Sequence, residues 1–77
     1  MVFSEYLHKY AFVYICIDGD KRYYLSAYVT SITETHITFF DVYCKVYTYR
    51  ISDVVEIKAS NRTPTPQQKK MQEQYKW

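Results

Sequence analysis

Short runs of alternating apolar and polar side chains dominate most of the chain. The runs are rich in β-branched and aromatic residues, and turn-forming residues separate them. A period of two places successive side chains on opposite faces of a strand, so the pattern predicts five β-strands. We expect these strands at residues 11–17, 22–32, 37–42, 45–51 and 54–59.

The second predicted strand is unusually long for a globular protein, and its alternation indicates which side chains face the core. Asp18-Gly19 stands before it and is the strongest short signal for a hairpin turn. Ile32 breaks the alternation, and a bulge or sharp bend near Thr30 and Ser31 would return it to the core. We expect an inner side made of Tyr23, Leu25, Ala27 and Val29, and an outer side made of Tyr24, Ser26, Tyr28 and Thr30.

The third and fourth strands supply the rest of the predicted core. Ile37 and Phe39 point inward in the third strand. In the fourth strand Tyr47 and Tyr49 lie on the inner side if Ile51 faces the core. A slip of one residue would exchange them for the opposite set, and the sequence leaves both phases open. The opposite set consists of Val46, Thr48 and Arg50.

Both ends of the chain carry helical signals. At the N-terminus, apolar residues at three- and four-residue steps predict a short helix over residues 1–10, with Ser4 as its cap. After residue 59 the composition changes, and Thr65-Pro66 is a suitable helix start. We expect residues 67–77 to form a short polar helix that is frayed or disordered in isolation. The prediction is one domain at residues 1–59 followed by a basic tail at residues 60–77.

The length and the strand pattern together predict the fold class. A chain of 77 residues has room for one domain with a thin core. Five strands at short spacing, one of them long enough to bend, close most economically as a small barrel. We therefore expect a mainly β protein, a strongly bent five-stranded barrel with a short N-terminal helix and a basic C-terminal tail that can form a helix.

Charge and tyrosine content point to a binding surface. Residues 1–57 carry five Lys or Arg against seven Asp or Glu, whereas residues 58–77 carry five against one. A basic tail can contact phosphates, although simple solvation explains five charges as well. Ten tyrosines are too many for so small a core, so several must line a surface, an interface or a groove.

The sequence lacks a recognisable set of residues for catalysis or for binding a metal. His8 and His36 have no Ser, Cys or carboxylate in a recognisable arrangement. One glycine excludes a glycine-rich phosphate loop, and Cys16 and Cys44 lack metal-site spacing. We expect a protein that is not an enzyme and has no cofactor or metal. With no signal peptide, no membrane-spanning run and no disulfide framework, the pattern predicts a soluble cytoplasmic protein.

Residues 13–57 resemble the Sm-like family, and within it the bacterial Hfq branch. The resemblance lies in the first strand and its turn (VYICIDG), the bent second strand (YVTSI), the third strand (HITFFD) and the segment from Tyr49-Arg50-Ile51 to Ile57. The chain has Ser26 or Ala27 near the family's strand glycine, Thr33 at its loop aspartate and Ile51 at its histidine. Tyr49 and Arg50 are therefore the positions that carry over as nucleotide contacts.

The resemblance implies a fold, an assembly and a ligand. Family members form rings of six or seven subunits in which the fourth strand of one subunit pairs with the fifth strand of the next. They bind single-stranded RNA around the pore. Other Src-homology-3-like barrels share this strand order and mostly bind proteins.

Two functions therefore remain open from the sequence. The first is an Sm-like or Hfq-like homo-oligomeric ring that binds single-stranded RNA through surface aromatics and basic residues. The second is a protein-interaction module or small regulatory protein that docks a partner through its aromatic face or an edge strand. Ordinary packing inside the barrel is the simpler alternative for each tyrosine. The candidate contacts are Tyr24, Tyr28, Tyr49, Arg22, Arg50, Lys69 and Lys70, with Tyr75, Lys76 and Trp77 at the end of the tail.

Overall fold

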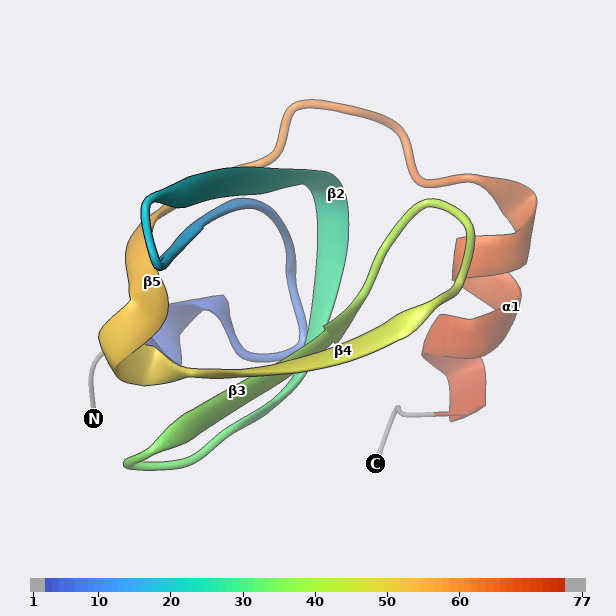
Figure 1. The fold of residues 1–77 in the computed structure, drawn as a ribbon. Coiled ribbons are helices and arrows are strands. Elements are labelled where there is room, and N and C mark those ends of the chain that lie inside the picture. The colour runs from blue at the N-terminus through green and yellow to red at the C-terminus, as the bar shows by residue number, and fades with distance from the viewer. Residues whose placement is uncertain (1–2, 75–77) are drawn as a thin grey trace.

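The computed structural model describes residues 3–74 and contains one antiparallel sheet of five strands. The strand order is β4-β3-β2-β1-β5, so β4 and β5 form the two edges (Figure 1). Each predicted strand is present, and the bounds of β5 agree with the prediction to the residue. The strands are β1 (Tyr10–Ile17), β2 (Asp20–Ile32), β3 (His36–Phe40), β4 (Val46–Arg50) and β5 (Val54–Ala59).

The predicted hairpin turn at Asp18-Gly19 is confirmed. Both residues have positive φ, 48° and 80°, as a type I′ turn requires, and Ile17 pairs directly with Asp20. Because a two-residue turn fixes the register, the pairing of β1 with β2 follows by counting away from the turn. Tyr14 consequently pairs with Tyr23.

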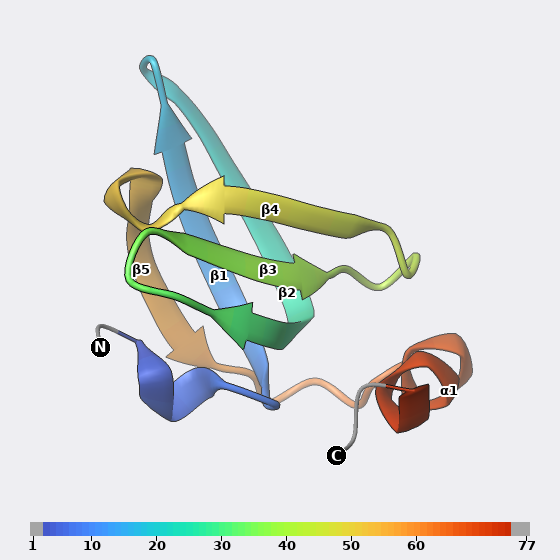
Figure 2. The same cartoon turned by 90° about the horizontal axis from the view of Figure 1, so that it is seen from below.

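Two bulges bend the long strand β2. The predicted bulge is present, since Val29 pairs with Phe39 while Ser31 pairs with Thr38, leaving Thr30 as the extra residue. A second bulge was not predicted: Leu25 and Ser26 together stand opposite Phe12. Ser26 there adopts a φ of 52°. The bends turn β2 through a corner (Figure 1), and β3 and β4 cross over β1 and β2 (Figure 2).

The core lies on the inner face of this bent sheet. Ile37 and Phe39 are fully buried as predicted, and Ile32 returns to the core after the bulge. Tyr47 and Tyr49 pack against the core while Val46 and Arg50 are exposed, which settles the phase of β4 in favour of inward tyrosines. The buried apolar cluster consists of Ala11, Val13, Ile15, Ala27, Val29, Ile32, Ile37, Phe39 and Ile57.

The predicted inner side of β2 is confirmed for the residues that follow the second bulge, and it is wrong for the residues that precede it. Ala27 and Val29 are fully buried, but Tyr23 is 64% exposed. Tyr24, predicted to face outward, instead packs against the core. The physical reason is the extra residue at Ser26, which reverses the alternation of the residues that precede it.

The tail forms the helix α1 (Pro66–Gln74), which docks on the sheet. Thr65 and Gln68 make a capping box: the backbone N–H of Gln68 donates to Thr65 Oγ1 at 3.1 Å, and the N–H of Thr65 donates to Gln68 Oε1 at 3.0 Å. The Gln68 side chain is fully buried, and its Nε2 donates to the backbone oxygen of Ser26 at 2.6 Å. Gln68 thus joins the tail to the bulge of β2.

The predicted N-terminal helix is wrong for the residues that the structure describes. A single 3-10 turn at Ser4–Tyr6 replaces it, and Ser4 makes no side-chain cap. The positive φ of Phe3 and His8 interrupts a regular helix, and His8 instead donates its N–H to Val29 O at 2.8 Å. Phe3 and Tyr6 still pack against the core. Within residues 3–74, no helix has the length and apolar character needed to cross a membrane.

Candidate functional site

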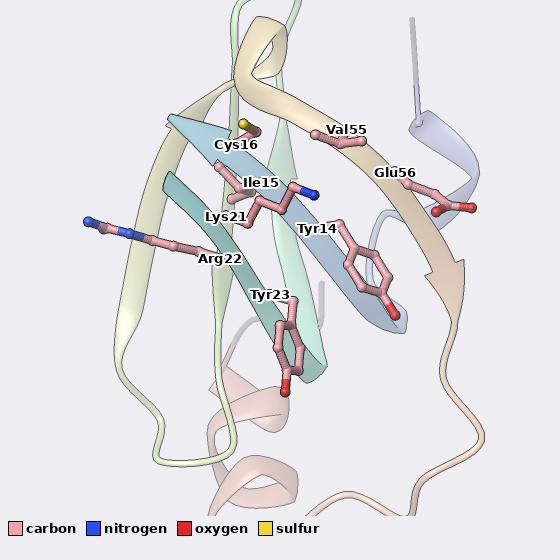
Figure 3. Close-up of a pocket in the computed structure, with 8 residues that line it drawn as sticks. All are labelled: Tyr14, Ile15, Cys16, Lys21, Arg22, Tyr23, Val55 and Glu56. Carbon is pink, nitrogen blue, oxygen red and sulfur yellow. The ribbon is translucent and has the colours of Figure 1, made fainter. Parts of the chain in front are cut away.

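The open part of the outer face, opposite the core, carries two tyrosines side by side. Tyr14 and Tyr23 are cross-strand partners on β1 and β2, and their rings lie 6.1 Å apart with an interplanar angle of 25°. Tyr23 is 64% exposed and Tyr14 is half-buried. Figure 3 shows both rings on the same side of the hairpin. We refer to Tyr14 and Tyr23 as the outer tyrosine pair.

A shallow hollow of about 500 Å³ adjoins the outer tyrosine pair. Lys21 extends across β1 into this hollow, while Arg22 points away from it (Figure 3). Lys58 Nζ lies 5.9 Å from the centre of the Tyr14 ring. The hollow is bordered by Cys16, a free thiol, and by Val55 and Glu56 of β5. The site therefore combines flat aromatic surface with two lysines and one carboxylate.

Three of the predicted contact residues meet on the inner side of the sheet. The hydroxyls of Tyr24 and Tyr49 are 2.6 Å apart, and the Arg22 guanidinium interacts with Tyr49 and lies 3.1 Å from Asp20 Oδ2. The Tyr24 ring also packs 5.0 Å from Phe39. Tyr24 and Tyr49 are therefore partly buried residues of the inner side that pack against the core.

The prediction that Tyr28 is a surface aromatic is wrong. Its side chain does point to the outer face, but it is only 1% exposed. The rings of His8, Tyr10 and Phe40 surround it at centroid distances of 6.4, 5.0 and 5.2 Å. Tyr10 in turn donates its hydroxyl to Gln72 Oε1 of α1 at 2.9 Å. The part of the outer face around Tyr28 is thus buried, and α1 is bound beside it through Tyr10 and Gln72.

The remaining predicted residues lie apart from the outer tyrosine pair. Arg50 borders a separate hollow of about 400 Å³ between the β2–β3 turn and the 3-10 turn at Ile51–Asp53, and it pairs with Asp53 at 3.5 Å. Lys69 and Lys70 are exposed on α1. Residues 75–77, which include three predicted tail contacts, lie outside the described residues.

Burial raises the pKa of four tyrosines, Tyr10, Tyr24, Tyr28 and Tyr47, and the effect is largest for Tyr10 and Tyr24. Burial raises the pKa of Tyr10 to about 12 from its ordinary value of 10.0, with a smaller contribution from Tyr28. Burial, followed by the hydrogen bond with Tyr49, also raises the pKa of Tyr24. In both cases the folded chain disfavours the phenolate.

The raised values predict a loss of stability at alkaline pH. The contribution of Tyr10 is fully present below pH 10.0, the unfolded value, and is lost as the pH rises toward about 12. We expect urea unfolding to show a lower free energy of unfolding at pH 11 than at pH 8, and Tyr10→Phe to have a smaller drop. An equal drop in Tyr10→Phe and the unmodified chain would contradict this assignment.

Both edge strands of the sheet expose an apolar residue. Among the strands of residues 3–74, β4 pairs with β3 alone and β5 pairs with β1 alone. Val46 on β4 is 49% exposed, and Val55 on β5 is 66% exposed. Val55 is the extra residue of a bulge, because Tyr14 pairs with Glu56 while Ile15 pairs with Val54. Because a bulge blunts an edge, the regular edge of β4 is the better suited of the two to pairing with another strand.

The outer tyrosine pair was missed at the level of sequence, although a signal for it was present. The turn at Asp18-Gly19 makes Ile17 pair with Asp20, and counting three further residues along each strand places Tyr14 opposite Tyr23.

The described residues contain no group of His, Cys, Asp and Glu that could hold a metal ion. Comparison with protein families, with characterised proteins and with solved structures found no match to this chain.

Proposed function

We propose that the chain is a non-catalytic Sm-like protein that binds single-stranded RNA on the outer tyrosine pair. In this proposal the bent sheet of one chain forms a small Sm-like barrel. Copies of the chain assemble into a ring of the Hfq type by pairing β4 of one copy with β5 of the next. One observation carries the proposal: two nearly parallel tyrosine rings lie beside two lysines on an open sheet face.

The chemistry of this face suits unpaired bases. Every base has a flat π-face, so exposed aromatic rings on a sheet bind single strands by stacking. Lys21 has no ion pair within the described residues, and its ammonium group is therefore available to a phosphate. Lys58 Nζ lies 3.7 Å from Glu56 Oε1 and 5.9 Å from the centre of the Tyr14 ring. Stacking supplies affinity for bases, and the lysines supply attraction for the backbone.

The assembly rests on the two edges of the sheet. β4 has five residues and β5 has six, and the part of β5 after its bulge at Val55, residues 56–59, would pair with β4. Pairing would cover Val46 and Val55, the exposed valines of these strands. The sheet order places the fourth and fifth strands at opposite edges, as the ring of the resembling family requires. Arg50, at the end of β4, would then lie at the junction between copies.

A second candidate function is favoured by the same edges. An exposed edge strand with an apolar side chain also accepts an extended segment of another protein by strand addition. This alternative predicts that the outer tyrosine pair is dispensable for capture of the partner. RNA binding that depends on this pair separates the two functions.

The test compares two exposed tyrosines. Fluorescence anisotropy would follow binding of a labelled single strand of alternating U and C, about 12 nucleotides long. We expect Tyr23→Ala to weaken binding about five- to 150-fold, because loss of one stacked base costs about 1–3 kcal/mol. Binding by the unmodified chain should also weaken steeply between about 50 and 200 mM salt.

Tyr43→Ala is the matched control, since Tyr43 is 84% exposed in the β3–β4 loop and lies outside the proposed site. It should bind as the unmodified chain does. The proposal fails if the unmodified chain does not bind at low salt, or if the two alanine variants bind equally well.

A further inference from the structure

One carboxylate stands beside the outer tyrosine pair. Glu56 on β5 is the direct cross-strand partner of Tyr14, and it is the acidic residue among those that line the hollow. Figure 3 shows its side chain projecting from β5 outward, toward the open edge of the sheet. Because direct cross-strand partners lie on the same face, a base stacked on Tyr14 that reaches past β5 would present one of its edges to the Glu56 carboxylate.

The Glu56 carboxylate is free to accept hydrogen bonds. Its side chain is 51% exposed, and within the described residues it forms an ion pair with Lys58, whose Nζ lies 3.7 Å from Glu56 Oε1, longer than a hydrogen bond. Lys58 itself leans over the Tyr14 ring. This ion pair is loose and solvated, so it leaves the lone pairs of Glu56 accessible to a ligand.

A carboxylate selects among bases by charge and by hydrogen bonding. It repels a phosphate, so a phosphate of the bound strand should contact Lys21, which has no ion pair within the described residues, while a base edge faces Glu56. An ionised carboxylate accepts hydrogen bonds and donates none. It therefore attracts the exocyclic amine of cytosine and repels the carbonyl oxygen that uracil carries at the same position.

We propose that the outer tyrosine pair prefers amine-bearing bases, and that Glu56 makes this choice by accepting a hydrogen bond from the amine. The inference rests on the proposed RNA binding, but it does not depend on the ring. Adenine belongs to the same class of ligand because it also carries an amine on its Watson–Crick edge. Cytosine and uracil give the sharpest comparison, since their rings have the same size and differ at this edge.

The experiment measures the ratio of affinities for oligocytidine and oligouridine of equal length, by anisotropy at one fixed salt concentration. We expect the unmodified chain to prefer oligocytidine by about fivefold or more. In Glu56→Gln the ratio should fall close to one, mainly through tighter binding of oligouridine, because the amide can also donate a hydrogen bond. Release of Lys58 raises both affinities and leaves the ratio unchanged.

Glu73→Gln is the matched control, because it removes one exposed carboxylate from α1 and should keep the preference. Equal affinities in the unmodified chain, or a preference that survives in Glu56→Gln, would overturn the role of Glu56 while leaving RNA binding intact. Failure to bind either oligonucleotide would overturn the proposed function and this inference together.

Discussion

Replacing Gln68 with alanine is expected to lower the free energy of unfolding by about 3 kcal/mol. The Gln68 side chain is fully buried and makes two bonds at once, to the N–H of Thr65 and to the backbone oxygen of Ser26. Its loss removes one of the two hydrogen bonds of the capping box, which costs about 1 kcal/mol, and leaves a buried carbonyl without its donor, which costs about 1–3 kcal/mol. Urea unfolding followed by circular dichroism measures the change.

The neighbouring glutamine provides the control for this prediction. Gln67 is exposed on the same turn of α1, so Gln67→Ala should change the free energy of unfolding by less than about 0.5 kcal/mol. If Gln68→Ala were as stable as Gln67→Ala, the tail would not be held by its buried amide. The docking of α1 described above would then be wrong.

Placing a lysine on a sheet edge is expected to reduce the assembly to single chains. Val46 on β4 and Val55 on β5 would be covered in the proposed ring. Val46→Lys puts a charge into that strand pairing, and lysine on an edge strand is a common natural device against edge association. Light scattering after size-exclusion chromatography should show the mass of one chain for Val46→Lys, with an unchanged circular dichroism spectrum.

The same charge placed away from the edge is the control. Tyr43→Lys adds a lysine in the β3–β4 loop, where the native side chain is 84% exposed, and should leave the assembly intact. A Val46→Lys variant that keeps the mass of the unmodified chain would show that β4 does not take part in the contact between copies.

Much of the strand pattern was predictable because it depends on local physical chemistry. Alternating apolar residues located all five strands, and Asp18-Gly19 fixed both the hairpin and its register. The break in phase at Ile32 correctly indicated the bulge at Thr30, because an inward isoleucine needs an extra residue there. These features leave a direct trace in the order of apolar and polar side chains.

The second bulge left no such trace, and this changed the candidate site. Ser26 occupies a left-handed position that favours glycine, so nothing in its identity marked the bend. The extra residue moved Tyr24 inward and Tyr23 outward, the reverse of the predicted arrangement. The exposed aromatic surface was therefore predicted one residue away from its actual place on β2.

The burial of Tyr28 depended on contacts between distant segments. Its outward direction followed from the alternation, but its cover comes from His8 and Tyr10, with α1 bound to Tyr10 through Gln72. The spacing of Thr65 and Gln68 is that of a capping box, which could have predicted the start of α1 more firmly. No local pattern, however, indicated that the amide of Gln68 would reach Ser26.

The mass of the unmodified chain in solution tests the proposed ring most directly. Light scattering coupled to size-exclusion chromatography gives this mass without reference to shape, and one chain has a mass of 9.3 kDa. Pairing of β4 with β5 around a closed ring predicts a single species with six or seven times that mass. A single species with the mass of one chain would contradict the ring, and would leave RNA binding by the outer tyrosine pair as a property of the isolated domain.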